Sequence, residues 1–436
     1  MLKATATVDK INTLHDLEFR SFVRNLDVMN IFQFKNLFKN TRLQRIQLYI
    51  IPILCLFSLK VGAQITLGAE QTHLYLDQIK NKNVAIVANP SSRINKTHLV
   101  DSLFSMGISI KKIFALEHGF RGDAANGEHI NSDIDKKTQL PVISLYGKHS
   151  KPTISDLEKI DLVIFDIQDV GVRFYTYLTS LHKIMEACAE NGVSLLVLDR
   201  PNPNGYYIDG PILDSSINSM VGIHPIPVVH GMTLGELSLM IKGEEWINKA
   251  RSLDLHVIPI ANYNHIMQYD LPVPPSPNLP NSNSIALYPT LGLLEGTIMS
   301  MGRGTSIPFQ CFGAPWLKGF NDTFTPYNIK GKAINPPYKG KLCHGYIFET
   351  KEINSLRKSG EININLIINL YNKYQTDYDK SMKKAPFFKP FLTLLIGNKE
   401  FQKQIESGWS ANQIRESWKS GLNKFKSKRE SYLLYP

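Results

Sequence analysis

Short apolar runs alternate with helical periods along the chain from residue 84 onward. The runs are Val84–Ala88, Ile113–Leu116, Leu140–Leu145, Leu162–Phe165 and Val193–Leu198. Each is almost continuously apolar, which is typical of strands that are buried on both faces of a parallel sheet. Apolar residues at helical spacing over 99–104 and 177–188 predict crossover helices between strands. The pattern therefore predicts an α/β fold, a Rossmann-like parallel sheet with flanking helices.

A segment rich in Pro, Asn and Ser, Leu271–Pro289, interrupts this pattern and predicts a domain junction without long regular structure. Beyond it the composition shifts toward Lys, Asn and aromatic residues, with a helix expected near Ile362–Tyr374. We therefore expect a Rossmann-like domain that carries the catalytic site over residues 64–285. A smaller C-terminal α+β domain is expected over 286–436.

Residues 1–63 form an N-terminal extension that ends like a secretory signal. A basic stretch at 39–45 precedes the apolar run Ile46–Leu59 and the small-residue sequence at 61–63. The apolar run is short for a membrane span. We expect a bacterial signal peptide near residues 39–63, a periplasmic or secreted mature protein starting near Gln64, and no permanent membrane span. Met29 is an alternative start, and an amphipathic segment followed by a buried helix is the alternative interpretation.

The charge distribution and the cysteines limit the kinds of partner and cofactor that the chain is expected to bind. The net charge is +11, but 9 Lys/Arg and 4 Asp/Glu lie in the first 63 residues, which leaves +6 for the rest. No basic run interleaved with aromatics follows, so a nucleic-acid partner is not expected. Cys188 fits a buried helix face, and no Cys/His cluster indicates zinc. Nucleotide-binding glycine motifs are absent, and we expect no cofactor.

Polar residues follow every predicted strand. Ligands of open α/β sheets bind beyond the carboxyl ends of the strands, so these loops should form one site. They contain Asn89, Glu117 to Arg121, Tyr146, Gln168 to Arg173, and Asp199 to Gly205.

Glu117 is the strongest candidate for catalysis. A carboxylate at a strand end, beside the apolar Leu116 and Phe120, lies where desolvation can keep a general acid protonated. The alternatives are that Glu117 caps a helix or pairs with Arg121.

Asp166 and Asp169 are candidates for the second carboxylate that glycoside hydrolysis usually needs. Asp166 and Gln168 share one side of the extended chain. Asp169 is equally compatible with capping a helix that begins near Phe174.

Arginines and histidines complete the candidate set. Arg173 and Arg303 offer bidentate donors for a carboxylate, although each fits a structural ion pair equally well. His118, His129 and Asp166 are conceivable metal ligands, but no HExxH sequence is present and no metal is expected. Thr233 and Glu236 predict a capping box at the start of a helix.

Six ordered strings, EHGFRG, DIQDVGVRFYTY, LDRPNPNG, PIPVVHGMTLGEL, SPNLP and GRGTSIPFQCFGAPW, resemble the NamZ exo-β-N-acetylmuramidases. The likeness runs from about Val84 to about Trp316 and is weaker beyond. It implies a Rossmann-like catalytic domain, and it implies that Glu117 is the catalytic candidate and that Tyr146 assists it. The family often has Pro where Leu116 stands here. The resemblance leaves the partner nucleophile or base unassigned.

Together these observations predict an exo-acting glycoside hydrolase that releases N-acetylmuramic acid from the non-reducing end of peptidoglycan fragments. The substrate would be a small carbohydrate or muropeptide. The alternatives are a non-catalytic muropeptide-binding protein and a metal-dependent cell-wall hydrolase or deacetylase. The candidate substrate ligands are Asn89, His118, Arg121, Gln168, Arg173, Asn202, His230 and Arg303.

Overall fold

The computed structural model describes residues 64–117, 119–121, 133–378 and 385–436. The predicted extension and signal peptide over 1–63, including Met29, lie outside the described residues. Within the described ranges, no helix combines the length and the apolar character that a bilayer span requires.

A seven-stranded sheet forms the N-terminal part, in the order β5-β6-β4-β1-β7-β8-β9. Every pairing is parallel except that of β5 with β6. The strands are β1 (Val84–Ala88), β4 (Ile110–Ala115), β5 (Asp133–Ile134), β6 (Pro141–Ser144), β7 (Leu162–Asp166), β8 (Ser194–Leu198) and β9 (Leu255–Ile258). The predicted Rossmann-like sheet is thus confirmed.

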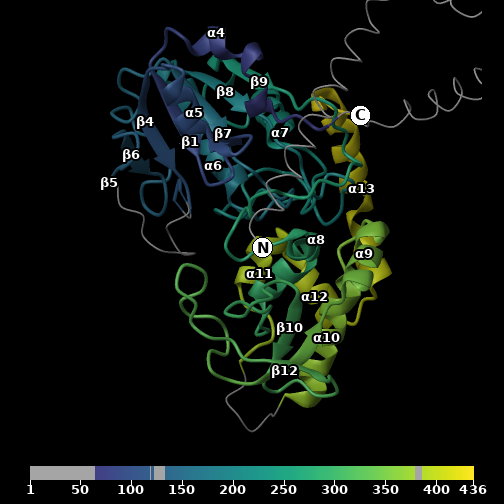
Figure 1. The fold of residues 1–436 in the computed structure, drawn as a ribbon. Coiled ribbons are helices and arrows are strands. Elements are labelled where there is room, and N and C mark those ends of the chain that lie inside the picture. The colour runs from purple at the N-terminus through teal and green to yellow at the C-terminus, as the bar shows by residue number, and fades with distance from the viewer. Residues whose placement is uncertain (1–63, 118, 122–132, 379–384) are drawn as a thin grey trace, which may run out of the picture. The chain divides into compact units, whose positions relative to one another are not determined.

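Helices cover both faces of the sheet, as Figure 1 shows. Alternate residues of β1 belong to separate cores, since Ile86 packs with α5 (Leu99–Ser105) and Val87 packs with α6 (Tyr177–Asn191). The same face as α6 carries α7 (Leu234–Gly243), and α4 (Leu76–Ile79) adds Ile79 to the α5 face. Two-sided burial explains why these strands read as continuous apolar runs.

The C-terminal part combines a small antiparallel sheet with helices, as expected of an α+β domain. The sheet order is β10-β12-β11 (Cys311–Ala314, Cys343–Ile347 and Asp322–Phe324). The helices are α8 (Ser282–Leu291), α9 (Thr350–Ser359), α10 (Ile364–Asp377), α11 (Phe391–Ile396), α12 (Glu400–Glu406) and α13 (Ala411–Arg429). The remaining elements are the hairpin β2–β3 (Arg93–Ile94 and Thr97–His98) and the 3₁₀ turns η1 (Gly68–Glu70), η2 (Thr72–Leu74), η3 (Ala250–Ser252), η4 (Gly292–Gly296) and η5 (Glu430–Tyr432).

The two parts share a core. Val172 and Phe174 pack in the same cluster as Leu291 and Ile367. Helix α13 runs beside both parts (Figure 1), and the tail after it reaches the sheet, where the Tyr435 hydroxyl donates to Asp199 Oδ2 at 2.6 Å. The parts therefore hold each other in a fixed arrangement.

Of two local predictions from the sequence, one is confirmed and one is wrong. The Thr233 and Glu236 capping box is confirmed, since Thr233 Oγ1 accepts from Glu236 N at 3.2 Å and Glu236 Oε2 accepts from Thr233 N at 2.9 Å. The expected absence of regular structure up to Pro289 is wrong, because α8 begins at Ser282. The Asn281 side chain caps it by accepting from Ser284 N. A good cap outweighed the loop-like composition.

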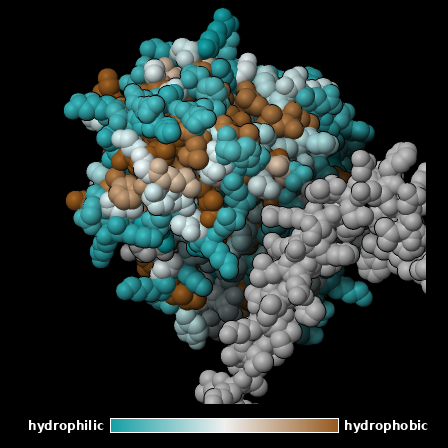
Figure 2. Space-filling view, turned by 45° about the horizontal axis from the view of Figure 1, so that its top comes forward, coloured by the Kyte–Doolittle hydropathy of each residue, from teal (hydrophilic) through white to brown (hydrophobic). Residues whose placement is uncertain are grey.

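The molecular surface is mostly hydrophilic on the face that Figure 2 presents, with hydrophobic residues in smaller groups between the polar ones. This is the ordinary surface of a globular protein.

Candidate active site

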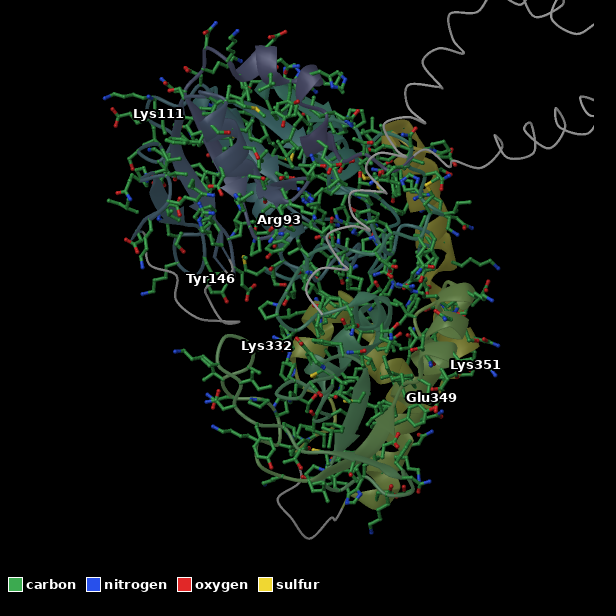
Figure 3. All side chains as sticks on the ribbon, in the orientation of Figure 1. Arg93, Lys111, Tyr146, Lys332, Glu349 and Lys351 are labelled. Atoms are coloured by element: carbon green, nitrogen blue, oxygen red, sulfur yellow. The ribbon has the colours of Figure 1, made fainter. Side chains whose placement is uncertain are left out.

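A cavity of about 150 Å³ lies between the carboxyl end of the sheet and the C-terminal part. Glu117 and Phe174–Thr176 line it from the sheet side, and Glu295 and Arg303 line it from the C-terminal side. Ser276 and Asn278 of the junction segment complete the wall. Figure 3 shows Tyr146 at the end of the sheet domain nearest the C-terminal elements, whereas Lys111 lies at the opposite end. Sites at such interfaces are typical of enzymes.

Two side-chain hydroxyls hold the Glu117 carboxylate. Tyr146 Oη donates to Glu117 Oε1 at 3.2 Å, and Thr176 Oγ1 donates to Oε2 at 3.3 Å. The Tyr177 hydroxyl donates to the backbone carbonyl of Glu117 at 3.3 Å. The carboxylate is therefore oriented by neutral donors at the cavity wall.

The strand ends explain this placement. Strand β4 ends at Ala115, and Gly119 turns the chain with φ 75° while its N–H donates to Leu116 O at 3.1 Å. Tyr146 follows β6, which pairs with β4 in parallel, so both residues lie at the same sheet edge. Burial and the negative charge of Glu117 raise the pKa of Tyr146 to about 12, so its hydroxyl remains a donor at neutral pH.

Arg303 faces the same cavity. Its Nε and Nη2 donate to Glu295 Oε1 at 2.8 and 2.5 Å, and its guanidinium lies 4.9 Å from the centroid of the Phe309 ring. The Arg303 and Glu295 side chains are 19 and 22% exposed. This fixed, partly exposed arginine can bind a carboxylate that enters the cavity.

Aromatic rings form the apolar wall of the cavity. Tyr288 meets Phe174, Tyr175 and Phe309 edge to face, at centroid distances of 5.3, 5.9 and 5.0 Å. The Tyr175 hydroxyl is fixed by donation to Pro275 O at 2.8 Å. Such a wall suits the apolar C–H face of a sugar ring.

Asp166 lies outside this cavity lining, in a buried ion pair. Arg200 Nε and Nη2 donate to its two oxygens at 2.5 and 2.9 Å, and the two side chains are 0 and 4% exposed. Asp166 therefore does not line the cavity with Glu117, and both of its carboxylate oxygens accept hydrogen bonds from Arg200.

Asp169 is also buried, but no charged side chain in the described part of the chain pairs with it. Its Oδ1 accepts from Gly171 N at 2.7 Å, while Oδ2 has no hydrogen-bond partner among the described residues. Burial raises its pKa to about 7. The expected cap of a following helix is not observed, since α6 begins at Tyr177 after Thr176.

Arg173 and Arg121 have structural partners. The buried Arg173 guanidinium donates to the carbonyls of Pro211 and Ile226, and to those of Leu395 and Ile396 at the end of α11. It thus links the sheet domain to a helix of the cavity wall. Arg121 pairs with Asp101 and Asp135 at 3.0 and 2.7 Å, not with Glu117.

The remaining candidate ligands support the loops from within. Gln168 Nε2 donates to the carbonyls of Asp169 and Pro201, and Asn202 Nδ2 donates to Met232 O. Asn89 accepts from the Ser91 backbone and hydroxyl. His230 Nδ1 accepts from Met232 N, and burial lowers its pKa to about 3. None of these four residues lines the cavity.

His118 and His129 lie outside the described residues. Among the residues that are described, no group of three His, Cys, Asp or Glu side chains is arranged to hold a metal ion.

Sequence reasoning missed Thr176, Glu295 and Tyr288. Thr176 belongs to the string DIQDVGVRFYTY, where a neutral threonine gives no sequence signal of an active-site role. Glu295 lies eight positions before Arg303, a spacing that indicates no contact until η4 and the following loop fold back.

Comparisons with known proteins agree with this architecture. Residues 84–283 match the family "Exo-beta-N-acetylmuramidase NamZ, N-terminal", and residues 286–435 match "Exo-beta-N-acetylmuramidase NamZ, C-terminal". A similar protein is the peptidoglycan beta-N-acetylmuramidase NamZ of Bacillus subtilis (strain 168). It is 38% identical over 381 residues, which cover 83% of this chain and 89% of that protein.

Two crystal structures of DUF1343 family proteins from Bacteroides fragilis NCTC 9343 are similar in fold. One is 46% identical with a TM-score of 0.77 and covers 86% of this chain and 99% of that chain. The other is 27% identical with a TM-score of 0.69, covering 85% and 99%.

Proposed function

The chain belongs to the NamZ family of exo-β-N-acetylmuramidases, and from this membership we propose that it hydrolyses peptidoglycan fragments and releases N-acetylmuramic acid from their non-reducing ends. The observation that carries the proposal is the Glu117 carboxyl group, oriented by two hydroxyls at the wall of an aromatic-lined cavity.

Glu117 acts as the general acid. It donates its proton to the bridging oxygen of the glycosidic bond, the bond between that oxygen and the anomeric carbon breaks, and the oxocarbenium-like centre forms. Water supplies the hydroxyl of the released sugar, and its remaining proton restores the carboxylic acid. Tyr146 and Thr176 keep the carboxyl group in one orientation throughout.

A second group must stabilise the positive charge on the sugar. Asp166 is committed to Arg200, which favours Asp169 or the acetamido oxygen of the substrate itself for this part. The acetamido oxygen is the better candidate, because Asp169 does not line the cavity.

Arg303 recognises the lactyl carboxylate that distinguishes N-acetylmuramic acid from N-acetylglucosamine. Its pairing with Glu295 holds the guanidinium in place. The partly exposed side chain can then donate hydrogen bonds to a second carboxylate, that of the substrate in the cavity.

The enzyme acts in the periplasm or outside the cell. The tripartite sequence at residues 39–63 supports this part of the proposal.

The decisive experiment compares the wild type with Glu117→Gln on a chromogenic β-N-acetylmuraminide. Loss of the acid should lower kcat by about a thousandfold, with the thermal midpoint unchanged and chelators without effect on the wild type. A folded variant with wild-type turnover would contradict the assignment of Glu117. Saturable binding by the wild type without product release would instead identify a muropeptide-binding protein.

Arg303→Met tests the specificity. The wild type should prefer the N-acetylmuraminide over the matching N-acetylglucosaminide, and the variant should lose about tenfold or more of that preference. An unchanged preference would place carboxylate recognition elsewhere.

A further inference from the structure

A second, larger cavity lies in the C-terminal part. Its volume is about 730 Å³, and Trp316, Phe320, Tyr338 and Tyr378 line it together with Lys318 and Lys341. None of these residues lines the Glu117 cavity. We refer to it as the aromatic cleft, and we propose that it binds the glycan of a peptidoglycan strand as a second carbohydrate site.

The aromatic side chains of the cleft are held in fixed positions. Trp316 Nε1 donates to the Tyr338 hydroxyl at 3.1 Å, and that hydroxyl donates to Ile298 O at 2.6 Å. The Tyr378 ring meets Trp316 edge to face at 5.5 Å and 81°. The four aromatic residues are only half-buried. The rings are thus fixed by their own contacts, so a ligand does not have to order them.

This combination of surfaces fits a sugar. A pyranose ring has an apolar C–H face that stacks on an aromatic ring, and hydroxyls at its edge that need polar partners. Aromatic walls with a few polar groups at the rim provide both. The cleft volume lies within the range of small-ligand sites, about 300–1,000 Å³.

The rim of the cleft adds positive charge. Lys318 and Lys341 are exposed, and neither forms an ion pair with any described residue. The acidic Asp377 is already engaged, because it accepts from Lys318 N at 3.2 Å and lies 3.8 Å from Lys373 Nζ. Peptidoglycan strands carry carboxylates on their lactyl and peptide groups, so the rim favours them over a neutral glycan.

One stretch of chain connects the cleft with the catalytic cavity. Glu295 and Arg303 face the cavity, whereas Ile298 O and Trp316 belong to the cleft and its support. A strand bound at the cleft would therefore be retained by the same stretch of chain that supplies the cavity wall. The site goes beyond the proposed function, which supplies only the identity of the glycan.

The test is cosedimentation of the full chain with insoluble peptidoglycan sacculi. Trp316→Ala removes the central ring, and Trp409→Ala is the matched control at an exposed tryptophan outside the cleft. Lys318→Glu with Lys341→Glu reverses the rim charge without touching the core. Its control is Lys351→Glu with Lys358→Glu on the exposed face of α9.

Both cleft variants should bind sacculi about tenfold or more weakly, while both controls bind like the wild type. Turnover of the small chromogenic substrate should stay within about twofold. Chitin, a neutral glycan, should bind more weakly than sacculi and should not respond to the lysine reversal.

The proposal is overturned if the lysine-reversed variant binds sacculi like the wild type. It is also overturned if Trp316→Ala changes the size of the protein in gel filtration, because the cleft would then be a contact between copies of the chain. Since turnover is measured separately, failure here leaves the assignment of Glu117 untouched.

Discussion

Glu117 and Asp166 occupy similar places but different environments. Glu117 follows β4 and Asp166 is the last residue of β7. These two parallel strands flank β1 in the sheet, so both carboxylates lie at its carboxyl edge. Glu117 receives two neutral hydroxyls and lines a cavity, whereas Asp166 is fully buried and receives two N–H groups from Arg200. The strand end alone does not make a carboxylate available to a substrate.

The difference follows from the partner of each carboxylate. A buried carboxylate needs a compensating charge, and Arg200 supplies it for Asp166. The hydroxyls of Tyr146 and Thr176 orient Glu117 at the cavity wall, where a substrate can reach the carboxyl group. One edge of the sheet thus contains a structural carboxylate and a candidate catalytic one.

The largest expected effect comes from Asp166→Asn. Losing one member of a buried ion pair leaves Arg200 uncompensated, and the free energy of unfolding should fall by about 3–5 kcal/mol. Urea denaturation measures it. The folded fraction should retain turnover within about tenfold, in contrast to Glu117→Gln.

Two further variants calibrate this result. Asp166→Leu with Arg200→Met removes both charges and should recover part of the stability. Glu416→Gln breaks the exposed pair with Lys419 and should change stability by less than about 1 kcal/mol. If folded Asp166→Asn loses turnover as completely as Glu117→Gln, the distinction between the two carboxylates fails.

The sequence predicted the sheet better than it predicted the site. Strands such as Val84–Ala88 are continuous apolar runs, so the local composition alone predicts that both faces of the strand are buried. Strand β9 was missed, because the burial of Leu255–Ile258 is incomplete at this sheet edge. Glu117 was found because an acidic residue directly follows an apolar run.

The roles of charged residues could not be read in the same way. The partner of Asp166 lies 34 positions away, and the carbonyls bound by Arg173 lie up to 223 positions away. Such partners become visible only in three dimensions, and they decided which of the predicted ligands face the cavity. Glu295 was missed for the same reason.

Tyr146→Phe tests how much the neutral donors contribute to the catalytic carboxyl group. Removing the hydroxyl takes away one of the two hydroxyl donors described for Glu117, and kcat should fall about tenfold with KM nearly unchanged. Steady-state kinetics on the chromogenic substrate measure the split.

The control for Tyr146 is Tyr327→Phe, because Tyr327 is exposed and lies outside the cavity. If the kcat of Tyr146→Phe is no lower than that of Tyr327→Phe, the Tyr146 hydroxyl does not position Glu117.

Asp169 offers the most discriminating effect, because it is buried like Asp166 but pairs with no charged side chain among the described residues. Its pKa is about 7 in the folded protein, above the ordinary value of 3.8, so the folded state binds more protons between these two pKa values. The stability that the protonated Asp169 contributes is therefore fully present below about pH 4, and it is lost as the pH rises through about 7.

Asp169→Asn removes this titration, and its free energy of unfolding relative to the wild type should rise by about 4 kcal/mol between pH 4 and pH 8, since each pKa unit corresponds to about 1.4 kcal/mol. Urea denaturation of both proteins at the two pH values measures the change, and Asp214→Asn is the control at an exposed aspartate. An equal difference at both pH values would mean that Asp169 stays ionised when folded. Asp169 would then be ionised in the folded protein like Asp166, although it has no arginine partner. Burial without a paired cation would not distinguish Asp169 from Asp166.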